Sequence, residues 1–364
     1  MRTLLFKYLC LTAVMLPFPG LADSGGGMKG KYTKEKTIKK EFSVNADALL
    51  KVKNSYGNLN ITSWDQNSVM IEVKIKTNGN NEERVQDRLE EITVDFDTSQ
   101  SMVSAITRFG NRNNNWGWKW GRRNNVSIQV NYTIKLPIKN SVNLSNDYGN
   151  IYLDRVDGHA KISCDYGKME IGELRGRNNE LRFDYTSRST FEYVNSAEII
   201  ADYSGFTIEK AGNLDVKADY TNAAIDEMEN LKYASDYGSM EVGKVTNVEG
   251  VGDYIGIKLG DVHGNVSVTS DYGSLKIARM GSDAGDVNIE SDYTGIKIGY
   301  HPEYYFDFDI STEYAGVNGI DDFEIQIRKE KSGEKYYNGY HGNDNSGNVI
   351  QIRSEYGGVS FYKN

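Results

Sequence analysis

The chain contains little cysteine and little proline. It has two cysteines and four prolines in 364 residues, and of these only Cys164, Pro137 and Pro302 lie beyond residue 22. A lone cysteine cannot form an internal disulfide, so an exported chain of this size must be held together by its core. The scarcity of proline leaves long stretches that can form uninterrupted β-ladders.

Apolar runs long enough to span a membrane are also lacking. The only apolar run near the start, Tyr8 to Leu16, follows Arg2 and Lys7 and precedes the small-residue site Gly20-Leu21-Ala22. This three-part pattern is typical of a secretory signal peptide and is too short for a convincing membrane span. We expect residues 1–22 to be removed and the mature chain to be exported to the periplasm or the cell surface, without a transmembrane segment.

Positive charge and histidine are scarce as well. The net charge is −9, and losing Arg2 and Lys7 with the signal peptide makes it −11. This acidity argues against a nucleic-acid partner. The four histidines, His159, His263, His301 and His341, lie far apart in the sequence and at different positions of the repeat described next. No metal set or catalytic triad emerges from them, and we predict no cofactor, no metal and no enzymatic activity.

Tyrosine, in contrast, is abundant, and it marks a repeat. Of 25 tyrosines, twelve share one local frame, as in "NDYGNIYL", "CDYGKMEI" and "SDYGSLKI". From Tyr148 to Tyr314 they recur every 17–21 residues, and the last interval, to Tyr356, is 42, which equals two intervals of 21. The members of this tyrosine row are Tyr56, Tyr148, Tyr166, Tyr185, Tyr203, Tyr220, Tyr237, Tyr254, Tyr272, Tyr293, Tyr314 and Tyr356.

Apolar residues alternate on both sides of each tyrosine. They recur six and four positions before it, and three, five and eight positions after it, as in Val266, Val268, Leu275, Ile277 and Met280 around Tyr272. Each unit is therefore two short strands joined by turns rich in Gly, Asn and Ser. Such a unit cannot bury its apolar face alone, so the units must stack. We predict an all-β fold, a β-solenoid (parallel β-helix-like) of coils of 17–21 residues in which each coil pairs with the next.

The predicted organisation has four parts. A signal peptide at 1–22 is followed by a basic N-terminal arm at 23–44, by an N-terminal cap with the first coil at 45–136, and by the solenoid repeats at 137–364. The cap contains the one helical pattern, "NNEERVQDRLEEI", with Val85, Leu89 and Ile92 on one face and Asn80 or Asn81 as its cap, and a Trp-rich hairpin loop. We expect a hairpin in the stretch from Asp321 to Asn348, and a bulge where Arg188 replaces an apolar residue.

These residues resemble a known family. A leading strand ending in "NSYGNLNI", then Trp64 and "SVMIEVKI", a short acidic helix, "YTIKLPIKNSVNLSNDYGNIYL" and tandem tyrosine–glycine coils are similar to the "putative adhesin" family of exported bacterial repeat proteins, in its tyrosine-rich form from Bacteroidetes-type envelopes. The resemblance covers the chain from about residue 40. It implies a repeat architecture and a role at the cell surface, and it implies no catalytic residues.

The acid before each tyrosine has two interpretations. It is Asp in most units and Glu at 313 and 355, and stacked acids repel one another by about 1 kcal/mol per pair even in water. Either each Asp bonds the amides of its own turn, or the row holds cations such as Ca²⁺. We expect the first, and thus a structural role for the acid–tyrosine pairs Asp147 and Tyr148, Asp165 and Tyr166, Asp236 and Tyr237, Asp271 and Tyr272, and Asp292 and Tyr293.

The place of the bend decides the role of the tyrosine row. In most units small residues lie two positions before the tyrosine and one after it, so the alternation of inward and outward side chains must shift between them. A bend after the tyrosine would bury the rings at a corner, and a bend at the Asp–Tyr pair would form an exposed aromatic stripe. We expect burial, because contiguous exposed aromatics are a liability. Cys164, in the small position before the pair, is interpreted as a buried filler.

The most unusual stretch is "RFGNRNNNWGWKWGRRNN". It has three tryptophans, five basic residues and no acid: Trp116, Trp118, Trp120, Arg108, Arg112, Lys119, Arg122 and Arg123. Indoles stack on sugars, and arginines pair with carboxylate or phosphate. The loop either grips an anionic glycan or envelope component, or folds back as part of the cap. We predict a non-enzymatic, adhesin-like envelope protein; the alternatives are a structural or assembly protein without a ligand, and a polysaccharide-acting β-helix enzyme.

Overall fold

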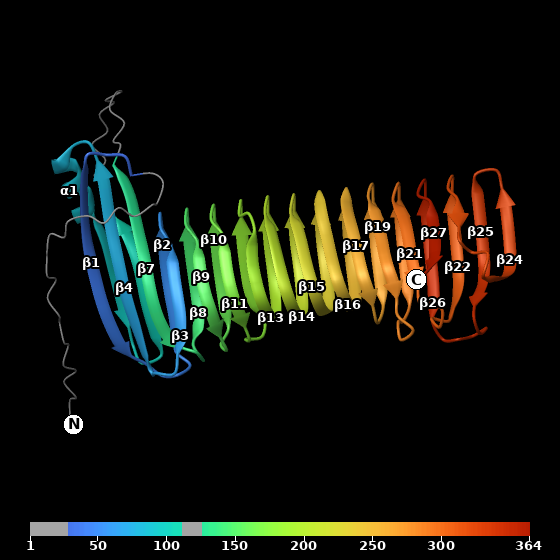
Figure 1. Cartoon of the computed structure of the whole chain (residues 1–364), viewed down its shortest axis with the longest axis horizontal. Helices are drawn as coiled ribbons and strands as arrows, with labels where there is room; N and C mark the ends of the chain where they lie inside the picture. Colours follow the sequence, from blue (N-terminus) through green and yellow to red (C-terminus); the bar gives the residue numbers. More distant parts are fainter. Residues whose placement is uncertain (1–27, 111–125) are drawn as a thin grey trace.

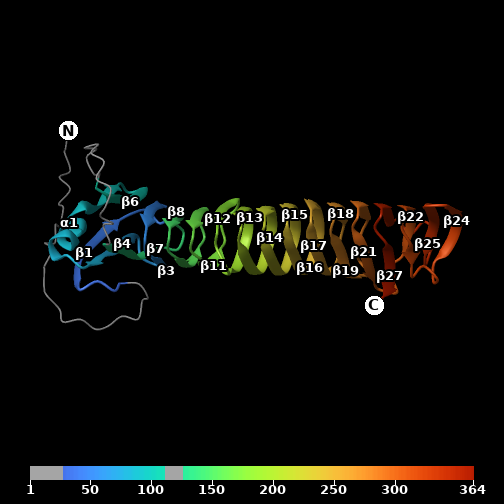
Figure 2. The same ribbon diagram turned by 90° about the horizontal axis from the view of Figure 1, so that it is seen from above.

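The computed structural model describes residues 28–110 and 126–364. It is all-β apart from one helix, and its 27 strands belong to a single hydrogen-bonded sheet. Figure 1 shows the strands as one long row from the N-terminal to the C-terminal end, and Figure 2 shows that they lie in two layers along most of the molecule. The all-β prediction is confirmed.

The N-terminal end is a three-stranded antiparallel arrangement covered by the helix. Strand β1 (Tyr32–Ser43) pairs with β4 (Ser68–Gly79), and β4 pairs with β7 (Ser127–Pro137). Most of the segment predicted as a basic arm, residues 23–44, therefore forms the edge strand β1. Four lysines, at 34, 36, 39 and 40, lie on this strand, and lysine on an edge disfavours pairing with another chain.

Helix α1 (Glu82–Glu91) forms where the sequence predicts it. The Asn81 side chain caps it by accepting a 2.9 Å hydrogen bond from the Arg84 N–H, and Val85 and Leu89 are buried. The helix packs on β4 and β1. With ten residues and a charged outer face it is not a membrane span, and no helix within the described ranges is long and apolar enough to be one.

Four further strands connect this end to the repeats. They are β2 (Leu49–Ser55), β3 (Leu59–Trp64), β5 (Ile92–Thr98) and β6 (Met102–Phe109). Strands β5 and β6 form an antiparallel hairpin, and β6 pairs in parallel with β2. Strand β3 lies between β7 and the first repeat, parallel to both. The pairing thus changes here from antiparallel to parallel.

Each repeat unit consists of two strands that meet at its tyrosine. The strands before a tyrosine are β8 (Ser141–Asp147), β10 (Ala160–Asp165), β12 (Asn179–Asp184), β18 (Val266–Asp271) and β20 (Val287–Asp292). The strands after one are β9 (Ile151–Val156), β11 (Met169–Leu174), β17 (Ile255–Val262), β19 (Ser274–Met280) and β21 (Gly295–Tyr300). Four longer strands combine both roles: β13 (Ser189–Asp202), β14 (Gly205–Asp219), β15 (Asn222–Asp236) and β16 (Gly238–Asp253).

Successive units pair in parallel and in register. Asp219, for example, lies opposite Asp202 on one side and Asp236 on the other. Equivalent residues of neighbouring units therefore lie directly against each other. The apolar positions form continuous buried rows, such as Ile208, Ile225, Val242, Leu259, Ile277 and Ile298, each at most 1% exposed. The core is the stack of these rows, as the alternation of apolar residues predicts.

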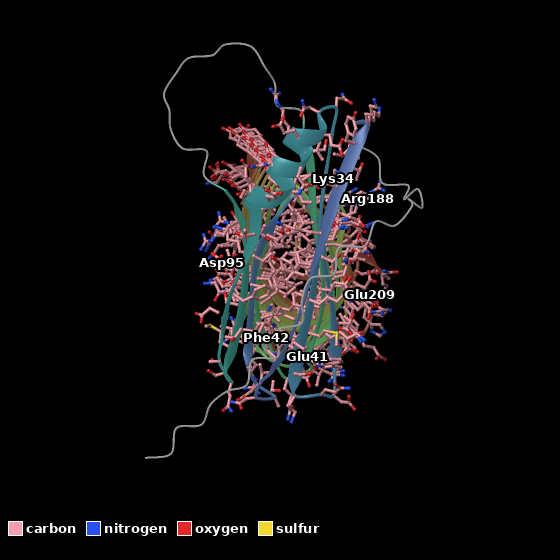
Figure 3. The ribbon with its side chains drawn as sticks, turned by 90° about the vertical axis from the view of Figure 1, so that its left-hand side faces the viewer. Lys34, Glu41, Phe42, Asp95, Arg188 and Glu209 are labelled. Atoms are coloured by element: carbon pink, nitrogen blue, oxygen red, sulfur yellow. The ribbon has the colours of Figure 1, made fainter. Side chains whose placement is uncertain are left out.

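One unit contains an extra residue. Arg188 has a positive φ of 59°, and Ser189 takes the place opposite Phe206 that the residue three positions after the tyrosine holds elsewhere. The irregularity expected at Arg188 is present as an additional residue in the turn before β13, and the side chain of Arg188 lies at the surface (Figure 3). The extra residue lets the rest of the unit return to register.

The C-terminal units do not follow chain order. Strand β26 (Val349–Glu355) lies between β20 and β22 (Phe306–Glu313), and β27 (Val359–Lys363) lies between β21 and β23 (Val317–Asn318). The expectation that each coil pairs with the next along the chain is therefore wrong at this end. The predicted hairpin is present as β24 (Glu324–Lys331) and β25 (Glu334–His341), which adds to β22 and ends the sheet.

The close approach of units makes a specific prediction about the core. Gly250 lies opposite Tyr233, and a Cβ at Gly250 would come within 1.9 Å of the buried Tyr233 ring. Gly250→Ala should therefore lower stability by about 1–3 kcal/mol through overpacking. Gly295→Ala is the matched control, because no atom lies within 4 Å of its added Cβ. Urea midpoints followed by circular dichroism test this, and equal midpoints for the two variants would contradict it.

Candidate functional site

The tyrosine row is the most regular surface feature of the structure. All twelve tyrosines have a positive φ, between 50° and 63°, and each is 44–67% exposed. A single residue with a left-handed backbone reverses the alternation of inward and outward side chains. The residues two before and one after the tyrosine therefore both point inward, and the ring points outward.

The prediction that the rings are buried at a corner is thus wrong. The bend lies at the tyrosine itself, a placement that alternation alone could not identify. The rings are exposed at the surface, but they cover one another's faces by stacking. Eleven neighbouring ring pairs have centroids 4.7–5.4 Å apart and planes within 10° of parallel. This spacing is that of the strands, about 4.8 Å, so the sheet brings the rings into offset-stacked contact.

Both ends of the tyrosine row are closed. The Phe109 ring packs against Tyr56 at the N-terminal end, with ring centroids 5.7 Å apart and an interplanar angle of 87°. At the other end the backbone of the β24–β25 turn lies against Tyr314, where the Tyr314 N–H donates to the Gly333 carbonyl and a Cβ at Gly333 would come within 3.0 Å of the ring. The ring faces are therefore occupied by neighbours, and the ring edges and hydroxyls face the solvent.

At the bends, a buried polar side chain lies at one of two positions, either two residues before the tyrosine or directly after it. Where glycine follows the tyrosine, the residue two before it is polar: the Asn146 Nδ2 donates to the Gly57 carbonyl, and the Ser354 hydroxyl to the Gly357 carbonyl. Where alanine lies two before it, a hydroxyl follows: the Thr221 Oγ1 donates to the Ala201 carbonyl. Both arrangements satisfy a buried carbonyl, which explains the small residues on each side.

Cys164 takes this inward position, as predicted. It is fully buried, and its Sγ lies 3.5 Å from the Gly149 carbonyl oxygen. Burial, and then the nearby carboxylates of Asp165 and Asp147, raise the pKa of the thiol to about 12. The thiolate is the reactive form of cysteine, so this thiol is unreactive at neutral pH.

The acids next to the tyrosines form a second row, the acid row. Its members are Asp147, Asp165, Asp184, Asp202, Asp219, Asp236, Asp253, Asp271, Asp292, Glu355 and Glu313, which lie opposite one another in neighbouring units. The expectation that each Asp bonds its own turn is wrong where the bonds are seen. The Oδ1 of Asp202, Asp219, Asp236 and Asp271 accepts from the backbone N–H of the next acid in the stack, at 2.9–3.3 Å. The carboxylates thus link units.

The acid row makes no ion pair in the described residues, although the charge of Arg182 partly opposes the raised pKa of Asp165. Lys–Glu pairs join neighbouring units elsewhere, as between Lys217 and Glu198, but in residues 28–110 and 126–364 no ion pair involves the acid row. Burial and then the carboxylates of Asp236 and Asp271 raise the pKa of Asp253. Within the same ranges no three His, Cys, Asp or Glu side chains are grouped to hold a metal ion.

The pKa is raised above its ordinary value for four hydroxyls of the tyrosine row, those of Tyr166, Tyr237, Tyr272 and Tyr356. The pKa of Tyr237 is raised by partial desolvation, by Tyr220 and Tyr254, and by the neighbouring acids. The same causes raise the pKa of Tyr272. The exposed edge of the tyrosine row is therefore a line of hydrogen-bond donors beside a line of carboxylates. Figure 3, which views the molecule along its long axis, shows side chains of successive units lying behind one another in such rows.

A groove lies at the opposite end of the strand that precedes each tyrosine. Asparagines seven positions before the tyrosines bond one another: Asn230 Nδ2 donates to Asn213 Oδ1 at 2.6 Å, and Asn247 Nδ2 to Asn230 Oδ1 at 2.7 Å. They line a cavity of about 920 Å³ with Glu198, Lys232 and others. This groove was not predicted, although asparagine recurs in the sequence seven positions before Tyr220, Tyr237 and Tyr254.

Two other predicted features are not brought together as a site. Of the eight contact residues predicted in the Trp/Arg stretch, Arg108 alone lies within the described residues. Its Nε donates to Asp95 at 2.9 Å, and residues 111–125 lie outside them. The histidines are dispersed: His263 pairs with Asp283 at 2.9 Å, and His341 is buried against the Tyr304 carbonyl at 3.0 Å. The predicted signal peptide, residues 1–22, also lies outside the described residues.

Comparison with known proteins gives distant structural matches. No family model matches the chain, and no curated protein does. Matched structures include a "putative adhesin" from Bacteroides fragilis (10% identity, 90% of this chain and 97% of that chain, TM-score 0.28). Others are a "putative adhesin" from Parabacteroides distasonis (11%, 75% and 94%, 0.29) and a "putative cell adhesion protein" from Clostridium sporogenes (13%, 91% and 100%, 0.19).

The raised pKa of Asp253 predicts how stability depends on pH. A carboxyl whose pKa is raised on folding destabilises the folded state when it is ionised, and this effect disappears below its unfolded value of about 3.9. Asp253→Asn should therefore raise the urea midpoint at pH 7, and the gain should vanish as the pH falls to about 3. Asp261→Asn is the control, because Asp261 pairs with Arg279 at 3.0 Å, so it should bring no gain. A gain independent of pH would contradict the charge argument.

Proposed function

We propose that the protein is an exported, non-enzymatic β-solenoid that makes surface contacts in the cell envelope, and that the tyrosine row is its contact surface. The units would wind as coils, each contributing one tyrosine and, in all but the first, one acid. The N-terminal helix and strands and the C-terminal β24–β25 hairpin would cap the two ends, where raw strand edges would otherwise aggregate.

The observation that carries this proposal is the identity of the residue at the bend. A left-handed backbone costs a residue other than glycine about 1–2 kcal/mol, and asparagine or aspartate tolerates it best. The chain nevertheless has tyrosine at all twelve bends. Ring stacking contributes about 0.5–1.5 kcal/mol per pair, which at most offsets that strain. Folding alone gives no reason to prefer tyrosine, so the exposed side chain is the feature that the repeat preserves.

The chemistry of the tyrosine row restricts what it can bind. Because neighbouring rings cover each other's faces, sugars cannot stack on them, and a ligand meets ring edges, hydroxyls and the adjacent acid row. Each unit offers the same groups at strand spacing along roughly 50 Å. A long ligand with repeating hydrogen-bonding groups, such as an envelope polysaccharide, would make many weak contacts at once. The buried core rows hold the surface rigid, which limits the ordering entropy lost on binding.

The Trp/Arg stretch remains a second proposed contact. Its composition predicts affinity for anionic glycans, whereas the tyrosine row beside the acid row does not favour anions. The two surfaces would therefore bind different materials.

Three substitutions test the tyrosine row. Tyr203→Asn, Tyr220→Asn and Tyr237→Asn together should keep the fold, because asparagine tolerates the left-handed backbone, and should reduce retention on envelope polysaccharides and intact bacterial cells by about tenfold or more. The corresponding Phe variants keep the rings and remove only the hydroxyls. Lys210→Asn, Lys232→Asn and Lys258→Asn form the control set, since these exposed lysines lie away from the tyrosine row.

Three outcomes would contradict the proposal. Unchanged binding by the Asn set would exclude the tyrosine row as the contact. A parent protein that binds none of these materials would favour a purely structural role. Release of soluble fragments from the polysaccharides would identify an enzyme instead.

A further inference from the structure

The last unit of the chain occupies an internal position in the stack. Along the stack the tyrosines run Tyr293, Tyr356, Tyr314, with ring centroids 4.7 Å and 5.1 Å apart. The unit that ends the chain therefore lies between two units that precede it in sequence. The chain must leave a slot between β20–β21 and β22–β23, build the hairpin β24–β25, and return to fill the slot with β26–β27.

The slot matches this unit on both sides. Strand β26 pairs in parallel with β20 from Ile350 to Glu355 and with β22 from Val349 to Glu355. Strand β27 pairs with β21 and with β23. The inserted unit buries four apolar side chains, each at most 4% exposed: Ile350, Ile352, Val359 and Phe361. The slot is thus a specific receptor for one strand–turn–strand segment.

The connection to the inserted unit has the features of a hinge. Residues 342–348 contain three positive φ angles, at Gly342 (80°), Asn345 (57°) and Gly347 (97°). Most of these residues are exposed. Such a segment can change direction at low cost in backbone strain.

The inserted unit is also separable from its neighbours. Tyr293 and Tyr314 are 21 residues apart, as are Tyr272 and Tyr293, so the flanking units have the period of units that stack directly. Strand β14 is joined to each neighbouring strand along the chain by two residues, whereas β26 follows β25 only after the seven residues 342–348. Local opening should therefore be easiest here.

We infer that the C-terminal unit, residues 349–364, is exchanged between copies of this chain and fills the slot of a second copy. The second copy presents the identical slot, so the pairing, burial and tyrosine stacking are the same within one chain and between two. Exchange joins two molecules at their C-terminal ends and doubles the number of tyrosine rows in one particle. This inference is independent of what the tyrosine row binds.

Pairs of cysteines test the exchange in the full chain. The Ser291 and Ser354 hydroxyls face each other at 3.1 Å across the slot boundary, at the inward position that Cys164 occupies in its own unit. Two full-length proteins, both with Cys10 and Cys164 replaced by Ser, would carry Ser291→Cys and Ser354→Cys respectively, the second with a larger tag. They would be mixed, warmed below the unfolding midpoint, oxidised and separated without reductant.

A mixed disulfide between the two proteins is the expected result. The matched control is Ala218→Cys mixed with Ser235→Cys, because these inward residues also lie opposite each other but in internal units. The slot pair should give about tenfold more mixed dimer than the control pair, since an internal unit is released only by global unfolding. The double variant Ser291→Cys/Ser354→Cys in one chain should close internally and shows that the geometry permits the bond.

Two results would overturn the inference. One is that Ser291→Cys and Ser354→Cys give no more mixed dimer than the control pair, although the double variant forms its internal disulfide. The other is a monomeric Ser354→Cys protein whose thiol reacts rapidly with a maleimide, because the last unit would then leave its slot without entering a second copy.

Discussion

The structure depends on in-register parallel pairing of units that are nearly the same length. Because equivalent residues lie opposite each other at strand spacing, each side chain of one unit contacts the equivalent side chain of the next unit. Leucine, isoleucine and valine form the core rows, because packing these side chains against one another removes apolar surface from water and leaves no polar group without a partner. Asparagine also tolerates this arrangement, since each amide has both a donor and an acceptor for the next amide.

Tyrosine and aspartate show what the same constraint costs. Tyrosine rings accept self-pairing because offset stacking is favourable at this spacing, and the left-handed bend directs them outward. Aspartate gains a backbone N–H from the next unit but faces like charges on both sides, and the raised pKa of Asp253 records this. The tyrosine row and the acid row, which lie side by side on the surface, thus each carry a cost: the left-handed backbone for the tyrosines and the repulsion of like charges for the acids.

The two ends show how an indefinitely repeatable pattern is stopped. At the N-terminal end the pairing turns antiparallel and finishes on a lysine-bearing edge strand beneath a helix. At the C-terminal end an antiparallel hairpin with a charged outer strand does the same. Both edges carry the side chains that disfavour further pairing. The inserted unit β26–β27 departs from this arrangement, because it comes later in the sequence than both of the units between which it lies.

The sequence by itself determined the all-β class, the two-strand unit, the core rows, the short helix, the C-terminal hairpin and the irregular unit at Arg188. All of these follow from the local spacing of residues along the chain, and repetition adds support for the two-strand unit and the core rows. The sequence left the helix cap open between Asn80 and Asn81, and the structure identifies Asn81. Tertiary structure alone decided three things: the outward tyrosines, the links between acids of neighbouring units, and the place of the last unit. Their physical reason is shared. Each depends on which residues of different units lie opposite each other and on one backbone angle at the bend, and neither is encoded in the alternation of apolar and polar residues within a unit.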